Sequence, residues 1–413
     1  MPRPWPWLAG LIAASLAVSP PVAHAQDPDQ GGETDQGGEA DHGGETDHGG
    51  ETDQGGEADQ AEAEPPASTL ERLVGALAFH PFVDVYYAYS LSRPADGDNF
   101  PPAGTSAKRY NAFSANLIGL GLELEPGVAD VPVGFRLWVQ WGTGAEILRQ
   151  NEVAAPGVSR DILRAIQLAS VRFIVPPVPG LELEVGVLVG HTGHESFRSW
   201  ENVWYTRGWL AELIPYNQTG IRIAYTASEG FHAELHVLNG WDTITDVNAG
   251  KTLGVQLRYD AATWYVKLDG LFGPEIPNAS EWRVMGDVVL SWTPSPLLEL
   301  ASTGQAVWEQ QPGPVGPAIW GGAGVFARIG LVLDWLYLGI RGEIYRDRDG
   351  VLTGLSQTFG EATLTLDLRI YDVASVKLEG RYDRSTADLF QSNEPGVGRQ
   401  DQVLLTLGVA AYL

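Results

Sequence analysis

The sequence predicts an all-β fold: a transmembrane antiparallel up-and-down β-barrel of about 16 strands, with about 14 to 18 compatible with the pattern. From Phe79 to Leu413, stretches of roughly ten residues alternate apolar and polar side chains, which face opposite sides of a sheet. Every second connector is longer than its neighbours, as in barrels with short periplasmic turns and long extracellular loops. Essentially no charged residue falls on the apolar face of a strand interior.

The N-terminus, Met1–Ala25, predicts a cleaved signal peptide. Arg3 supplies the positive charge, Leu8–Val18 forms a short apolar core, and Ala23-His24-Ala25 is a cleavage site of the A-x-A type. The apolar core is short for a membrane-spanning anchor, which is the less favoured alternative. We therefore expect an exported protein.

Residues 26–69 predict a disordered acidic tail. Gly31–Gln60 consists of five copies of the unit GGE(T/A)D(Q/H), and residues 26–69 contain no Lys, Arg or aromatic residue. Such a segment cannot bury enough apolar surface to offset the entropy lost on ordering. A solvated spacer is the favoured interpretation, and weak cation binding helped by His42 and His48 is the alternative.

The third predicted region, residues 70–413, is the barrel. A short helical turn over Leu70–Ala78, capped by Ser68 or Thr69, precedes the first strand. The predicted strands are 79–91, 111–124, 132–141, 165–175, 181–190, 218–227, 231–239, 252–259, 263–272, 283–292, 297–308, 322–334, 336–346, 361–370, 373–383 and 402–413. The short links between them are rich in Pro, Gly or Asp, the residues that turns require. The chain contains no Cys, so strand pairing and packing must stabilise it without disulfides.

The distribution of charge predicts which face meets lipid. In strand 361–370, for example, Leu364, Leu366 and Leu368 share one face, and Asp367 and Arg369 share the other. A lipid-facing Arg or Lys at mid-membrane costs on the order of 2–4 kcal/mol, which explains the exclusion of charge from the apolar face. The pore-lining candidates are Asp84, Arg136, Arg172, Glu182, Glu184, Arg222, Glu234, Arg258, Lys267, Asp269, Arg283, Asp287, Arg328, Arg341, Glu343, Asp367, Arg369, Lys377, Glu379 and Arg381.

A large soluble all-β protein is the alternative fold. It would also have a polar outer face, but its long loops should occur at both ends. Aromatic residues on the apolar side near strand ends favour the membrane barrel, because they are typical of interfacial belts. These residues are Trp141, Trp264, Trp282, Trp292 and Tyr382.

Phe197–Ile214 does not follow the strand pattern. Its aromatic residues and helix-compatible spacing predict a helical element that is too apolar to extend freely into water. We expect it to fold against the barrel wall or into the mouth, where it would narrow the pore; a helix that caps the rim or meets a neighbouring subunit fits equally well. The candidate constriction residues are Phe197, Trp200, Trp204, Tyr205, Arg207 and Trp209.

Two groups of histidines could in principle carry chemistry. His191-Thr-Gly-His194-Glu195 has the order H-x-x-H-E, which differs from both zinc motifs, H-E-x-x-H and H-x-x-E-H. His232, Glu234 and His236 share a strand face, but such residues more often line a wet lumen. No Ser has a recognisable nucleophile context. We therefore expect no enzyme, no cofactor and no metal, and the sequence shows no basic stripe or phosphate loop for nucleic acid.

Several segments resemble outer-membrane β-barrel porins of the porin-2 type. They are Phe79–Tyr89 followed by Arg93-Pro94, Asn116–Leu124, Pro132–Leu137, Glu195–Arg222, and Asn239-Gly-Trp-Asp242 before Lys251-Thr252. The resemblance covers about Phe79 to the C-terminus and excludes the acidic repeat. It implies a barrel that acts as a passive pore.

Sixteen strands leave an aqueous channel, whereas eight would be filled by side chains. We therefore expect passive diffusion of small hydrophilic solutes and ions across the outer membrane of a Gram-negative bacterium, with mild selectivity set by mixed wall charges. A non-conducting structural or surface-interaction barrel plugged by residues 195–214 is the first alternative, and an outer-membrane barrel hydrolase is the second.

The expected partners follow from this location. They are outer-membrane lipid, small hydrophilic solutes and the barrel-assembly machinery, which would recognise the last strand. Outer-membrane barrels usually end in an aromatic residue, whereas here the final residue is Leu413 and the aromatic Tyr412 precedes it. The acidic tail would be periplasmic. The barrel would be a monomer or a homo-oligomer such as a trimer.

Overall fold

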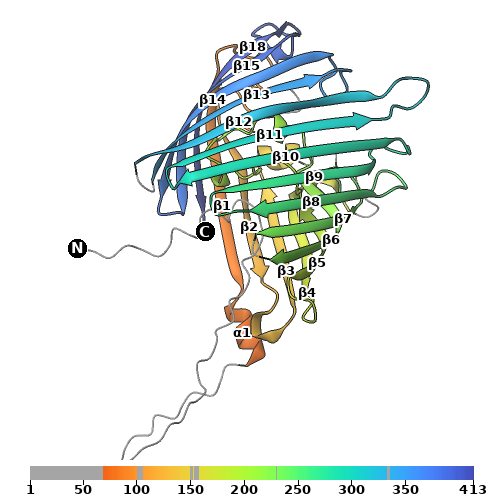
Figure 1. The fold of residues 1–413 in the computed structure, drawn as a ribbon. Coiled ribbons are helices and arrows are strands. Elements are labelled where there is room, and N and C mark those ends of the chain that lie inside the picture. The colour runs from red at the N-terminus through yellow and green to blue at the C-terminus, as the bar shows by residue number, and fades with distance from the viewer. Residues whose placement is uncertain (1–67, 100–105, 149–151, 153–157, 229, 333–334) are drawn as a thin grey trace, which may run out of the picture.

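Sixteen antiparallel strands form a closed barrel, in which the last strand, β18, pairs with the first, β1 (Figure 1). The computed structural model describes residues 68–99, 106–148, 152, 158–228, 230–332 and 335–413. The barrel strands are β1 (Ala78–Ser90), β2 (Ala112–Leu124), β3 (Val133–Trp141), β4 (Ile166–Ile174), β5 (Leu181–Val189), β6 (Asn217–Ser228), β7 (Phe231–Leu238), β8 (Thr252–Asp260), β9 (Trp264–Pro274), β10 (Trp282–Ser295), β11 (Leu298–Glu309), β12 (Ala318–Val332), β13 (Leu336–Asp347), β14 (Gln357–Ile370), β15 (Ala374–Ser385) and β18 (Asp401–Tyr412). Closure leaves no unpaired sheet edge.

Every predicted strand is present, so the predicted barrel of about 16 strands is confirmed. The largest differences lie at the starts of β12 and β14. For example, β14 begins at Gln357 rather than at residue 361, because Gln357 still pairs with Asp347 at the end of β13. The remaining small strands, β16 (Phe390–Gln391) and β17 (Gly398–Arg399), pair with each other in the connector before β18.

The connectors alternate in length as predicted, and the barrel therefore has a short-turn end and a long-loop end. At the short-turn end, Tyr371 and Asp372 join β14 to β15 with φ angles of 49° and 56°. Two successive residues with positive φ are typical of the tight hairpin turns that match strand twist. Residues 229 and 333–334, which belong to two other short turns, lie outside the described residues.

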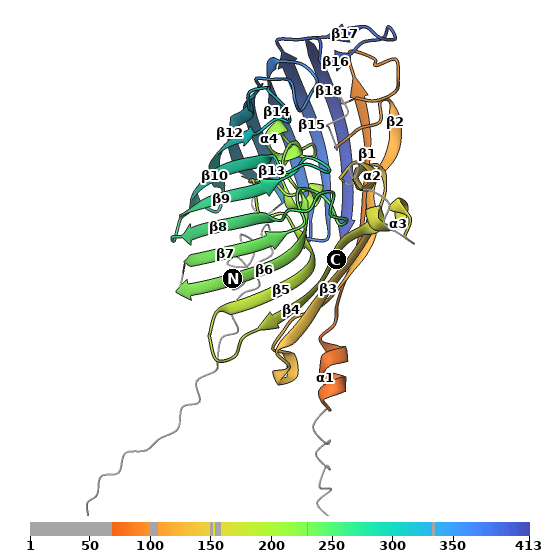
Figure 2. The ribbon, with the colours of Figure 1, turned by 90° about the vertical axis from the view of Figure 1, so that its right-hand side faces the viewer.

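The helix α1 (Thr69–Gly75) precedes β1 at the short-turn end (Figure 2). The Ser68 side chain accepts from Glu71 N, and the Glu71 carboxylate accepts from Ser68 N, which forms the capping box that stabilises a helix start. These hydrogen bonds lower the pKa of Glu71. The predicted turn and its Ser68 cap are confirmed. The predicted signal peptide (1–25) and the predicted acidic tail (26–69), apart from Ser68 and Thr69, lie outside the described residues.

The short helices η1 (Val128–Asp130), α2 (Thr143–Leu148) and α3 (Arg160–Ala165) lie in connectors. Among the described residues, no helix is long and apolar enough to cross a bilayer.

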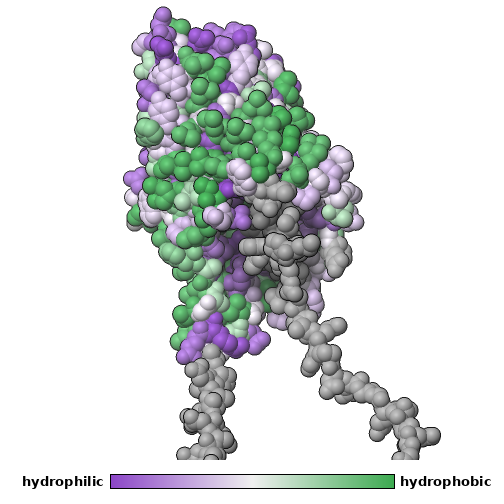
Figure 3. Space-filling view, turned by 90° about the vertical axis from the view of Figure 1, so that its left-hand side faces the viewer, coloured by the Kyte–Doolittle hydropathy of each residue, from purple (hydrophilic) through white to green (hydrophobic). Residues whose placement is uncertain are grey.

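The two barrel faces differ as the strand alternation predicts. Leu364 and Leu366 of β14 are exposed on the outside, whereas Thr363, Thr365 and Asp367 are buried inside. Figure 3 shows the resulting apolar surface between a hydrophilic rim at the long-loop end and hydrophilic residues at the other end. The outward aromatic residues predicted for interfacial belts are all exposed: Trp141, Trp264, Trp282, Trp292 and Tyr382.

Candidate functional site: the occupied barrel lumen

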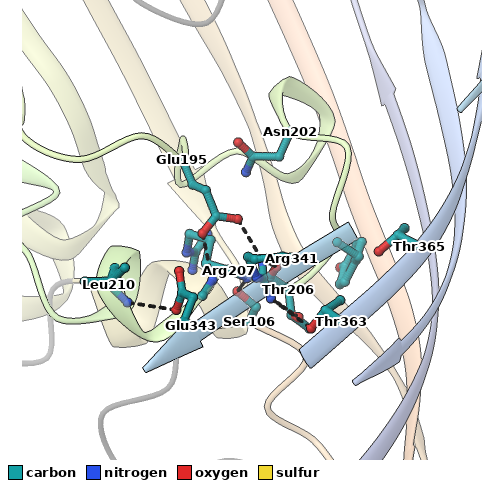
Figure 4. Close-up of polar contacts among 12 residues, drawn as sticks. Ser106, Glu195, Asn202, Thr206, Arg207, Leu210, Arg341, Glu343, Thr363 and Thr365 are labelled. Carbon is teal, nitrogen blue, oxygen red and sulfur yellow. Dashed lines mark hydrogen bonds and ion pairs between the residues drawn. The ribbon is translucent and has the colours of Figure 1, made fainter. Parts of the chain in front are cut away.

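The connector between β5 and β6 (residues 190–216, the inserted segment) folds into the barrel. Gly190 N donates to Tyr216 O at 2.8 Å, so the two ends of this segment meet at the wall and the residues between them project into the lumen. Figure 4 shows Glu195 and Arg207 of the segment close to Arg341 of β13. The candidate constriction residues all lie on the inserted segment and are buried: Phe197, Trp200, Trp204, Tyr205, Arg207 and Trp209.

The inserted segment contains less helix than predicted for residues 197–214. Only η2 (Ser199–Glu201) and α4 (Trp209–Glu212) are helical. Between them, the Glu379 carboxylate of β15 accepts from Tyr205 N at 2.7 Å and from Thr206 N at 3.0 Å. Because the barrel wall satisfies these buried donors, they need no carbonyl partners within a helix. The helical prediction holds only for the two short pieces.

Arg341 of β13 connects the inserted segment to the wall (Figure 4). Its Nη1 donates to Glu195 Oε1 at 2.7 Å and to Thr206 O at 2.6 Å, and its Nε donates to Glu361 Oε1 at 2.9 Å. Arg341 is 1 % exposed. One cation therefore binds a carboxylate of the segment, a carbonyl of the segment and a carboxylate of the neighbouring strand β14.

The segment also binds acidic residues of β1 and β15. Asp84 of β1 accepts from the Tyr205 hydroxyl at 2.8 Å and from Ser199 Oγ at 2.9 Å. Burial, followed by the Asp84 charge, raises the pKa of Tyr205 well above its usual value, so its hydroxyl remains a donor. Further along, Trp209 Nε1 donates to Asp383 Oδ1 of β15 at 2.9 Å. Short polar contacts thus fix the aromatic residues in one arrangement.

Cations of β14 and β15 bind carbonyl groups of the segment. Arg381 Nη1 donates to Arg207 O at 2.6 Å, and Arg369 Nη2 donates to Asn202 O at 3.2 Å. Lys377 Nζ also donates to Asn202 O. These bonds explain why inward-facing cations of this wall are buried rather than hydrated.

The opposite wall holds the start of the segment. Lys267 Nζ of β9 donates to His191 O at 2.9 Å and to Gly193 O at 2.7 Å, and Gln256 Nε2 of β8 donates to His191 O at 2.9 Å. Gly193 N donates to Asp287 Oδ1 of β10 at 3.2 Å. The inserted segment therefore spans the lumen from β8–β10 to β13–β15 and β1.

Aromatic contacts fill the space beside these bonds. The Trp200 ring lies between Phe82 of β1 and Tyr412 of β18, at centroid distances of 5.2 and 5.8 Å. Trp204 packs edge to face on Phe326 of β12 at 5.5 Å. Toward the long-loop end, apolar wall residues join the segment in one buried cluster, whose members include Leu238, Leu271, Met285, Val307, Trp320, Tyr345, Phe359 and Leu404. This part of the interior is an apolar core, which the sequence analysis did not predict.

The pore-lining candidates all belong to the inward face, and they divide into two sets. The first set binds the inserted segment directly: Asp84, Lys267, Asp287, Arg341, Glu343, Arg369, Lys377, Glu379 and Arg381. The second set consists of residues paired mainly with one another or with other wall residues: Arg136, Arg172, Glu182, Glu184, Arg222, Glu234, Arg258, Asp269, Arg283, Arg328 and Asp367.

A ladder of alternating charges crosses β3–β6. Arg136 lies 2.7 Å from Glu184, Arg222 lies 3.3 Å from Glu184 and 3.1 Å from Glu182, and Arg172 lies 2.9 Å from Glu182. Each cation thus has a carboxylate neighbour. The arrangement compensates charge locally and presents no surface of a single sign.

Near the short-turn end, inward charges remain accessible. Arg258 pairs with Asp260 at 2.6 Å, and their side chains are 15 % and 32 % exposed. Arg328 pairs with Glu299 at 3.1 Å, and their side chains are 23 % and 27 % exposed. The Arg341 side chain, deeper in the barrel, is 0 % exposed. The short-turn end of the inward face therefore carries a group of partly exposed charges, here called the charged vestibule: Arg222, Glu234, Arg258, Asp260, Glu299 and Arg328.

The histidines considered as metal ligands point in different directions. His191 contacts His236, whereas His194 Nδ1 lies 3.3 Å from the Tyr265 hydroxyl. On β7, His236 binds Glu234, whereas His232 binds Thr226 and lies 3.7 Å from Asp260. Among the described residues, no group of three or more His, Cys, Asp or Glu side chains has a geometry suited to a metal ion.

Glu195, Glu361 and Asp383 belong to this network but are absent from the pore-lining and constriction candidates. Glu361 and Asp383 share the inward parity of Asp367 and Arg381, so the same alternation rule could have found them. Glu195 lies outside any strand, and its pairing with Arg341 had no signal in the sequence.

The closed barrel, its apolar outer face and its charged interior define the class of the protein as an outer-membrane β-barrel of the porin type. A family model described as "Putative beta-barrel porin-2, OmpL-like" matches residues 76–413, and the chain belongs to this family. The predicted resemblance to porin-2 proteins is confirmed. A comparison with curated proteins found no match.

Solved porin structures share the fold. An anion-selective porin from Comamonas acidovorans superposes with a TM-score of 0.54 at 12 % identity, over 82 % of this chain and 99 % of that one. The outer-membrane channel DcaP of Acinetobacter baumannii gives 0.54 at 10 %, over 82 % and 97 %. Pseudomonas putida OprB gives 0.52 at 11 %, over 83 % and 96 %. At these identities, the similarity concerns the fold alone.

Proposed function

We propose that this barrel is an outer-membrane channel for small hydrophilic solutes and ions, and that the inserted segment restricts the passage. The family and the structural neighbours are porins and channels, which favours transport over the hydrolase alternative. The charged vestibule is the observation that carries the proposal. Its accessible ion pairs supply a hydrated entrance, which a barrel with only a mechanical role would not need.

The mixed charges of the wall bear on selectivity. Because Arg222 lies between Glu182 and Glu184, and Arg258 and Arg328 each have a carboxylate partner, neither sign dominates the vestibule. Rings and ladders of charge set ion selectivity in pores. We therefore infer weak selectivity that depends on the few residues that remain hydrated.

The location and partners follow from the proposed role. The signal peptide would direct export, the apolar outer face would contact outer-membrane lipid, and the short-turn end with the acidic tail would face the periplasm. β18 would be the strand that the barrel-assembly machinery recognises, and it closes the barrel by pairing with β1. A trimeric form of Vibrio cholerae OmpT has a similar fold (TM-score 0.51, 8 % identity). A trimer or a monomer therefore remains the proposed state.

A non-conducting barrel is the second candidate function. The burial of Trp200, Trp204, Tyr205 and Trp209, together with the apolar core at the long-loop end, favours a firmly seated plug. In that case the long loops would be the working parts of the protein.

Planar-bilayer recordings on the purified protein test the proposal. The full-length barrel should give small conductance steps, and a variant lacking residues 195–214 should give larger ones because the constriction is removed. Absence of steps in both proteins, with each barrel folded, would overturn the channel function and favour the second candidate. Liposome swelling with sugars of increasing size would then define the size limit of the solute.

A further inference from the structure

The inserted segment is attached to β7 by two stacked imidazole rings. His191, near the start of the segment, stacks on His236 of β7 with ring centroids 4.2 Å apart and an interplanar angle of 19°. His191 Nδ1 lies 2.9 Å from Gln218 Oε1, and His236 Nε2 lies 3.0 Å from Glu234 Oε2. The other two ring nitrogens, His191 Nε2 and His236 Nδ1, have no hydrogen-bond partner among the described residues. The contact is therefore a buried stack with only one polar contact per ring.

The surroundings of this stack oppose a positive charge on His191. His191 is 6 % exposed and His236 is 1 % exposed. Lys267 of β9 binds the His191 carbonyl, and the facing side chains Gln218 of β6 and Gln256 of β8 are neutral. Glu234 is the nearby carboxylate, but His236 and Arg222 already share it.

Burial, followed by the neighbouring His236, lowers the pKa of His191 to about 3. An imidazole in water has a pKa of about 6.5. His191 is therefore neutral when the segment is attached to the wall, and it can take up a proton once the segment is released into water. The sign follows from this difference: the attached state loses stability relative to the released state as the pH falls below about 6.5, by up to about tenfold in population per pH unit.

We propose that the His191–His236 stack is an acid-sensitive latch: protonation releases the start of the inserted segment from the wall formed by β7–β9 and widens the channel. The proposal rests on the channel function proposed above. Arg222 and Glu234 lie beside the latch and are only 13 % and 9 % exposed, so release of the segment would open this wall to the more exposed charges at the short-turn end. Contacts of Arg341 and Glu379 hold the far side, and the segment therefore shifts rather than leaves the barrel.

The pH dependence of single-channel current in planar bilayers tests the latch. For the full-length protein, the open probability should rise between pH 7.5 and pH 5.5 and approach about tenfold per pH unit below pH 6.5. His191→Phe keeps a ring for stacking and removes the titrating group, so its current should stay low at both pH values. His236→Phe keeps a ring for stacking and leaves His191 to titrate, so its current should still rise as the pH falls. His232→Gln, on the same strand but bonded to Thr226 rather than stacked, should keep the wild-type response.

The outcomes separate the latch from the channel. Currents that do not change with pH in the wild type, or a full response in His191→Phe, would overturn the latch and leave the channel function standing. Absence of current at both pH values, in the wild type and in the variant lacking residues 195–214, would overturn the channel function itself. Heat-modifiable mobility on gels verifies that each barrel is folded.

Discussion

Arg341 Nη1 lies 2.7 Å from Glu195 Oε1 inside the barrel, and the two side chains are 0 % and 1 % exposed. Buried ion pairs contribute little net stability over apolar packing, but removal of one partner leaves an uncompensated charge. This pair joins β13 to the inserted segment five residues after Gly190, where the two ends of the segment meet at the wall. It therefore fixes the position of the segment more than it adds to the stability of the barrel.

Glu195→Gln should loosen the inserted segment. Arg341 keeps Glu361 as a partner, so the free energy of unfolding should fall by about 3 kcal/mol or less, and the single-channel conductance should rise. Urea unfolding in detergent and planar-bilayer recordings measure the two effects. Glu201→Gln is the matched control, because its ion pair with Arg198 lies in the same segment but is partly exposed, and its loss should cost at most about 1 kcal/mol. Equal effects of the two substitutions would contradict the assigned role of the Arg341–Glu195 pair.

Tyr205→Phe removes the hydroxyl that donates to Asp84. The buried carboxylate keeps Asn116 and Ser199 as donors, so the expected loss in the free energy of unfolding is about 1–3 kcal/mol. Equilibrium unfolding monitored by tryptophan fluorescence measures it. Tyr87→Phe removes the exposed hydrogen bond to Asn111 and should cost less than about 0.5 kcal/mol. A smaller loss for Tyr205→Phe than for this control would show that the Asp84 contact does not anchor the segment.

The strands could be predicted from the sequence because the membrane imposes a strict rule on them. Charge on the lipid face is costly, so the alternation in β14 and β15 survives at almost every position. The alternation also predicted the inward placement of residues such as Asp367 and Arg381, which are buried in the structure. Only the ends of strands such as β14 differ, because pairing can continue beyond the membrane where no lipid enforces a pattern.

The organisation of the lumen could not be predicted in the same way. The contacts of Glu195 with Arg341 and of Trp209 with Asp383 join residues more than a hundred positions apart and obey no period. The helix expected over 197–214 is interrupted where Glu379 of the wall takes the backbone donors of Tyr205 and Thr206, whereas Glu343 accepts from Leu210 N in the first turn of α4. The spacing of residues along the segment does not indicate that distant wall residues will compete for its backbone donors. One weak feature of the sequence indicates the apolar core near the long-loop end: on the inward face of β9, the polar residues Lys267 and Asp269 are followed by the apolar Leu271.

An arginine on the lipid face should impair folding according to its depth. Leu366 lies in the middle of the outward face of β14, so Leu366→Arg should cost about 2–4 kcal/mol. Ile370 is also exposed but ends the strand, so Ile370→Arg should cost at most about 1 kcal/mol. Folding into lipid vesicles, followed by gel mobility, gives the two values. Equal costs at both positions would argue against a bilayer centred on this face.

Reversal of vestibule charges should change ion selectivity. Arg258→Glu combined with Arg328→Glu places two anions beside Asp260 and Glu299, which lose their cationic partners. The reversal potential in a KCl gradient should therefore move toward the potassium equilibrium potential, and the shift should shrink at 1 M salt, where the Debye length falls to about 3 Å. Arg399→Glu is the control, because Arg399 pairs with Asp401 at the long-loop end and is about half exposed there. An unchanged potential in the double variant, or an equal shift in the control, would show that ions do not pass through the vestibule.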